Sequence, residues 1–99
     1  MSEARIATAE IQELSLKLSP QQVVDYMNHL MPEAKCSFCH TGEYGVGYAP
    51  QSQYAAVVAT PVPNKDGMAL WYYPATCMSC GHVIFFNAMH VAETLSRKR

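Results

Sequence analysis

Two pairs of cysteines are the residues whose type and spacing could do chemistry. Cys36 and Cys39 form one CxxC motif, Cys77 and Cys80 form a second, and the chain contains no other cysteine. Two residues between ligands let a tight turn direct both sulfurs at one point, and two such turns complete a tetrahedron around a zinc ion. The sequence therefore predicts one structural Zn²⁺ held by four thiolates, with no coordination position left for a water or a substrate.

Three residues beside these motifs are candidates for supporting the metal. Gly81 directly follows the second pair, and a residue without a Cβ can take the positive φ that such a turn needs. His40 and His82 each follow a pair closely, and either could replace a cysteine as ligand or donate to a thiolate from the second coordination layer. Because four cysteines are available, we expect neither histidine to bind the metal directly.

Other interpretations of the cysteines remain open. They could be free thiols, or a CxxC pair could be a redox dithiol, although redox motifs generally open a helix in a βαβ context. Residues 36–40 also match the CxxCH pattern of c-type haem attachment. Iron held by four thiolates shares the tetrahedral geometry of zinc. We favour zinc because two pairs are present and residues 1–10 contain no long apolar run typical of an export signal.

The elements that must position the cysteines begin with a helix. Ser19, Pro20 and Gln22 form a capping box with proline at the first helical position, and Val23 and Met27 begin an apolar stripe at helical spacing. These signals predict a helix over about residues 20–31. Residues 1–18 fit helical and strand patterns equally well, so we predict a partly ordered N-terminal arm there and one domain over residues 19–99.

Most of the sequence between the two cysteine pairs, and the residues directly after the second pair, show strand patterns. Residues 44–48 suggest a short strand, and residues 54–60 and 68–73 predict a hairpin around the turn residues 63–67. Residues 82–86 predict a further strand, and Asn87 is a candidate cap for a short helix over residues 88–95. The predicted fold is a small α+β metal-bound domain: a three-stranded antiparallel sheet with two CxxC knuckles, an N-terminal helix and a short C-terminal helix.

Residues 18–87 resemble the zinc-ribbon proteins, most closely small uncharacterised members from bacteria and phages. The resemblance is carried by the helix opening LSPQQV at residues 18–23 and by CMSCGHVIFFN at residues 77–87. The first knuckle departs from the pattern, because His40 stands where a glycine is common. Zinc ribbons often bind nucleic acid or other proteins, so the resemblance implies a binding module with a structural zinc.

The net charge and the absence of catalytic motifs favour a binding function over an enzymatic one. Seven basic and eight acidic residues give a net charge of -1, which argues against a general attraction to nucleic acid or to anionic membranes. The sequence has no phosphate-cradling glycine loop, nucleophile elbow or HExxH motif, so we expect no enzyme activity. We expect a non-catalytic, cytoplasmic zinc-binding module that binds another protein through an apolar surface formed by the aromatic residues of its sheet or by its helix.

Two other functions compete with protein binding. Single-stranded nucleic acid could stack on Trp71 and Tyr73 while Arg97, Lys98 and Arg99 contact phosphate. A thiol redox or metal-handling role would instead require an exposed and easily oxidised cysteine pair.

Overall fold

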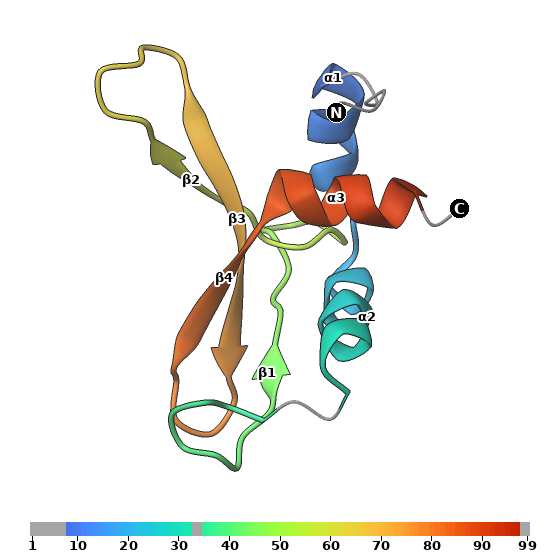
Figure 1. The fold of residues 1–99 in the computed structure, drawn as a ribbon, viewed down its shortest axis with the longest axis vertical. Helices are drawn as coiled ribbons and strands as arrows, with labels where there is room; N and C mark the ends of the chain where they lie inside the picture. The colour runs from blue at the N-terminus through green and yellow to red at the C-terminus, as the bar shows by residue number, and fades with distance from the viewer. Residues whose placement is uncertain (1–7, 33–34, 98–99) are drawn as a thin grey trace.

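The computed structural model of the chain describes residues 8–32 and 35–97, which form three helices and a four-stranded antiparallel sheet (Figure 1). The elements are, in order, α1 (Thr8–Ser15), α2 (Pro20–Leu30), β1 (Tyr44–Gly45), β2 (Val58–Pro61), β3 (Ala69–Cys77), β4 (Val83–Asn87) and α3 (Ala88–Arg97). The α+β class is confirmed. The sheet has four strands instead of the predicted three, because the two-residue strand β1 pairs with the end of β3.

Helix α2 begins where the capping box predicts. The Gln22 amide donates to the Ser19 Oγ at 3.2 Å, and the Ser19 amide donates to the Gln22 Oε1 at 2.8 Å. The two bonds satisfy amides that the first turn of a helix would otherwise leave without acceptors. Val23 and Met27 lie buried on one face of the helix, which therefore packs against the rest of the domain.

Strand β3 is the centre of the sheet, with β4 along one edge and β2 and β1 in succession along the other. Pro74 lies in the middle of this strand, where a proline would normally remove a hydrogen bond. Met78, four residues later and pointing to the same edge, donates its amide to the Glu43 carbonyl beside β1. On that edge β2 pairs only as far as Tyr72 and β1 only from Thr76, so Pro74 falls in the gap.

The core lies between the helices and one face of β3 and β4. Tyr73 is 0% exposed, and its hydroxyl donates to the Ser15 carbonyl at the end of α1. Ile11 of α1 belongs to the same buried cluster as Val23 of α2 and Val91 of α3. Residues 8–15 of the predicted arm thus form a helix packed into the domain, whereas residues 1–7 lie outside the described residues.

The opposite face of the sheet carries no helix in the described part of the chain, and Figure 1 shows α1, α2 and α3 on the same side of β3 and β4. Side chains alternate between the faces of a strand, and the register places one set together on this uncovered side. We call this set the open face: Val58, Thr60, Leu70, Tyr72, Pro74, Thr76, Val83, Phe85 and Asn87. No helix among the described residues is long and apolar enough to cross a membrane.

Replacing Tyr73 by phenylalanine tests the bond between sheet and α1. Burial raises the pKa of Tyr73 above its ordinary value, so its contribution to stability is full below about pH 10 and is lost as the pH rises further. We expect Tyr73→Phe to cost about 1–2 kcal/mol at pH 7, because the Ser15 carbonyl loses its donor. The measurement is urea unfolding at pH 7 and pH 10.5.

The pH dependence of stability distinguishes the effect of the buried Tyr73 hydroxyl from the effect of packing the ring alone. The wild type should lose more stability than Tyr73→Phe between the two pH values, whereas Tyr48→Phe, changed at a side chain that is 66% exposed, should behave as the wild type does. An equal alkaline loss in all three proteins would show that Tyr73 does not carry the effect.

Candidate metal centre

The first cysteine pair forms a tight turn between α2 and β1. The amides of Phe38 and Cys39 donate to the Cys36 Sγ at 3.2 and 3.4 Å, and the His40 amide donates to the Cys36 carbonyl at 2.9 Å. Amide donors of this kind stabilise a thiolate, because they place partial positive charge against the sulfur.

The second pair repeats the same turn between β3 and β4. The amides of Ser79 and Cys80 donate to the Cys77 Sγ at 3.3 and 3.4 Å, and the Gly81 amide donates to the Cys77 carbonyl at 3.0 Å. The two turns agree in every one of these bonds, so the two CxxC motifs adopt one backbone conformation. This match is the structural basis of the shared site.

The four sulfurs converge at one point. The Sγ atoms of Cys36 and Cys80 are 3.7 Å apart, as are those of Cys39 and Cys77, and all four lie within 4.8 Å of one another. Four sulfurs at about 2.3 Å from a zinc ion would be separated by about 3.8 Å in a regular tetrahedron. The donor set and its spacing therefore fit one metal ion, plausibly zinc, and no disulfide links these cysteines.

Both turns end in a residue with left-handed backbone. Gly81 has φ 88°, which is the positive φ that the sequence predicts for this glycine. His40 occupies the equivalent position of the first turn with φ 70°, although its Cβ makes this conformation unfavourable. The His40 side chain is exposed, and the residue takes part in the turn through its amide, which donates to the Cys36 carbonyl.

The protonation of the thiols depends on the amides around them. The amides of Thr41 and Gly42 lower the pKa of Cys39 to about 5, which makes it a thiolate at neutral pH. The His82 amide lowers the pKa of Cys80, but burial and hydrogen bonds with the other thiols together raise it by more. The pKa of Cys80 is therefore raised to about 12. Burial raises the pKa of Cys36, while its amide donors lower it more, so the result lies below the usual value.

Gly42 allows the two turns to approach each other, a role that its place in a loop-rich passage did not reveal. Its carbonyl accepts from the Cys36 amide at 2.8 Å. A Cβ at this position would overlap the Cys77 Sγ and would lie 2.8 Å from the Cβ of Ser79. The close approach leaves room only for a glycine, and the one signal in the sequence is its position three residues after Cys39.

His82 and Tyr44 form a second layer beside Cys36. The His82 Nδ1 lies 3.9 Å from the Cys36 Sγ and 3.3 Å from the Tyr44 hydroxyl, which also accepts from the Ser37 amide. Phe38 stacks on the His82 ring with centroids 5.7 Å apart. His82 thus lies beside Cys36, and Tyr44, for which the sequence indicates only a place in a short strand, lies beside His82.

The residues predicted to contact nucleic acid do not form one surface in the described part of the chain. Tyr73 is fully buried and has no surface on which a base could stack, so its assignment was wrong. Trp71 is half-buried against the core cluster, and Arg97 forms an ion pair with Glu93 at 3.4 Å. Lys98 and Arg99 lie outside the described residues.

The arrangement also bears on the other readings of the cysteines. A redox dithiol at the first turn of a helix has no counterpart here, because each pair lies in a turn next to strands. Attachment of haem would engage the first pair alone, whereas the structure brings both pairs to one point. Searches against protein-family models, curated proteins and solved structures give no match for this chain.

Gly42→Ala tests the close approach of the two turns. The added Cβ must displace the Cys77 sulfur or separate the turns, so we expect at least about tenfold weaker metal binding, as for the loss of a supporting group around a metal. Competition with a chromophoric chelator measures the affinity. Gly47→Ala is the matched control, because a Cβ there meets nothing within 4 Å. Equal affinities would refute the role of Gly42.

His40→Gly tests the backbone conformation of the first turn. Removing the Cβ should relieve left-handed strain and stabilise the metal-loaded protein by about 1 kcal/mol. Gly81→Ala makes the reverse change at the equivalent position and should destabilise by a similar amount. Thermal unfolding of both variants is the measurement. A loss of bound metal in His40→Gly would instead show that its imidazole is a ligand.

Proposed function

We propose that this chain is a non-catalytic zinc-ribbon module in which one structural Zn²⁺ holds a sheet that binds another protein. The observation that carries the zinc assignment is the convergence of four Sγ atoms within 4.8 Å at two matching turns. Four cysteine ligands fill a tetrahedral ion and leave no position for a substrate, which supports a structural role over a catalytic one.

The open face supports binding of a protein. Phe85 is 58% exposed and Leu70 46%, and the Phe85 ring packs edge-on against Tyr72 with centroids 5.9 Å apart. The open face contains no charged residue. Aromatic side chains supply much of the energy at the centre of protein interfaces, where charged residues are depleted. An uncharged apolar protein surface is therefore the partner that suits it best.

Nucleic acid suits the described surface less well. The described residues contain four lysines and arginines, and three of them, Lys17, Lys35 and Arg97, each pair with a glutamate at 3.2–3.4 Å, so the charges of these three are partly neutralised. A protein that binds single strands places aromatics in a positively charged groove, because phosphate contacts supply most of the affinity. The open face carries aromatic side chains but no positively charged ones.

Metal analysis of protein purified without added metal tests the first half of the proposal. We expect one zinc per chain, with no visible absorption of the kind that iron or haem would give. Cys77→Ser should remove the metal and unfold much of the sheet, because structural zinc contributes about 10 kcal/mol or more to folding. Iron, haem, or an unchanged thermal melt of Cys77→Ser would refute the zinc assignment.

Phe85→Ala tests the second half. A partner captured on the immobilised zinc-loaded protein is identified and purified, and its Kd is measured for the wild type and for variants. We expect Phe85→Ala to weaken binding about tenfold or more, as for an aromatic at the centre of an interface. Tyr48→Ala, which removes an exposed aromatic outside the open face, should leave the Kd unchanged.

Two outcomes would contradict protein binding by the open face. Equal Kd values for the wild type and Phe85→Ala would place the interface elsewhere. Binding to single-stranded oligonucleotides that falls steeply with salt would favour the nucleic-acid function instead. Sedimentation of the chain alone identifies the case in which the partner is a second copy.

A further inference from the structure

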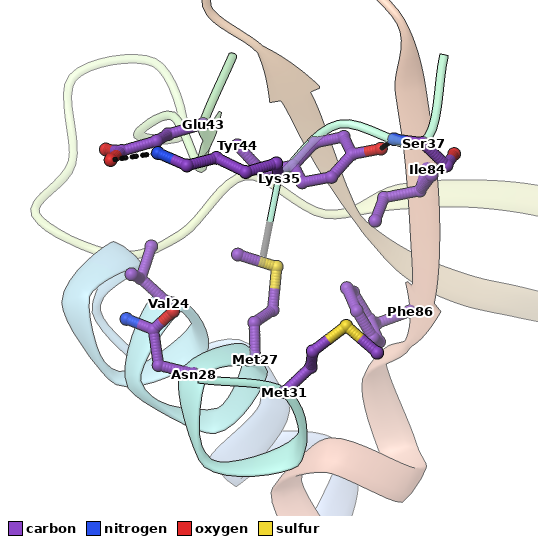
Figure 2. A pocket seen from close by; sticks show the side chains of 10 residues that line it. All are labelled: Val24, Met27, Asn28, Met31, Lys35, Ser37, Glu43, Tyr44, Ile84 and Phe86. Carbon is purple, nitrogen blue, oxygen red and sulfur yellow. Dashed lines mark hydrogen bonds and ion pairs between the residues drawn. The ribbon is translucent and has the colours of Figure 1, made fainter. Parts of the chain in front are cut away.

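A pocket of about 500 Å³ opens between α2 and the helix-facing side of the sheet, beside the first knuckle. Its walls are mainly apolar and are formed by Val24 and Met27 of α2, by Met31 directly after this helix, and by Ile84 and Phe86 of β4. In Figure 2 the Met27 side chain points from α2 toward Lys35 and Tyr44, and the Met31 side chain extends toward Phe86. The pocket lies on the side of the sheet opposite the open face.

The polar groups of the pocket lie on more than one of its walls. Lys35 extends across the pocket and pairs with Glu43 at 3.2 Å, whereas the amide side chain of Asn28 lies on the α2 wall (Figure 2). Tyr44 and Ser37 close the end next to the first knuckle. Because the one cation and the one anion of the lining are paired with each other, the pocket carries no net charge.

We propose that this pocket binds a small neutral molecule with a mainly apolar body and one hydrogen-bonding polar end, such as a primary amide. Its volume lies in the range of small-molecule sites, which combine apolar walls with a few polar groups that orient the ligand. A cationic ligand would have to displace Lys35 from Glu43, and an anionic ligand would have to displace Glu43 from Lys35. An amide can instead donate to the carboxylate or accept from the ammonium. Methionine side chains adapt to ligand shape, which suits an apolar wall.

This inference does not rest on protein binding by the open face. It uses the opposite side of the sheet. It shares with the metal centre Ser37 of the first knuckle and the Tyr44 side chain, whose hydroxyl lies 3.3 Å from the His82 Nδ1. Loss of the partner in Phe85→Ala and loss of ligand binding in the pocket are therefore independent results.

The experiment uses three probes with one apolar body: 4-phenylbutanamide, 4-phenylbutanoate and 4-phenylbutylammonium. Each is titrated into the metal-loaded chain labelled with ¹³C at the methionine methyl groups. The methyl signals of Met27 and Met31 should shift and saturate, while the exposed Met68 and Met78, which lie outside the pocket, act as internal controls. We expect the amide to bind about fivefold more tightly than either charged probe, since it alone leaves the ion pair intact.

Two variants locate the binding. Asn28→Trp places a large ring at the lining and should weaken amide binding about tenfold or more by filling the pocket. Gln21→Trp adds the same ring to an exposed position of α2 that does not line the pocket, and it should bind as the wild type does. Metal content and thermal unfolding confirm that each variant is folded.

A charge change keeps the test decisive should Asn28→Trp fail to fold. Lys35→Met leaves Glu43 without its partner, so the preference should move from the amide toward the ammonium probe. Preference of the wild type for the carboxylate, equal shifts at Met68 and Met78, or the absence of any shift would overturn the proposal. Displacement of Met27 and Met31 signals by the protein partner alone would assign the pocket to protein docking.

Discussion

The convergence of four sulfurs is the constraint on which the rest of this small domain depends. It joins a turn near the middle of the chain to the hairpin of β3 and β4, and Gly42 makes the approach possible because it has no Cβ to meet the Cys77 sulfur. A domain of about this size buries a modest core, whereas a structural zinc supplies folding energy comparable to the whole stability of an ordinary domain. A metal ion bound by the four cysteines would therefore hold β3 together with the helical core.

Strand β3 serves two ends of the molecule at once. One end carries Cys77 into the metal centre, while Tyr73 near its middle bonds to α1 through the Ser15 carbonyl. Pro74 between them is tolerated because β2 and β1 leave a gap on that edge. The same strand presents Leu70 and Tyr72 on the open face. Packing on one face and exposure on the other are thus both consequences of strand alternation along a single central strand.

The helix-facing side of the sheet is not uniformly packed. Near α3 the Tyr26 and Phe86 rings meet edge to face with centroids 6.1 Å apart, whereas toward the metal centre α2 leaves the pocket beside Met31 and Tyr44. The open face and the pocket give the domain two apolar surfaces of different shape. An exposed uncharged sheet surface suits a protein, and a concave one with a few polar groups and no net charge suits a small molecule.

The sequence by itself determined the features that arise from neighbouring residues. The CxxC spacing, the capping box at Ser19, the Asn87 cap that accepts from the His90 amide, and the left-handed Gly81 all follow from local stereochemistry, and the structure confirms them. Tertiary structure alone decided which distant segments meet. The pairing of β1 with β3, the close approach at Gly42 and the burial of Tyr73 depend on contacts between residues far apart in the chain, which local patterns do not encode.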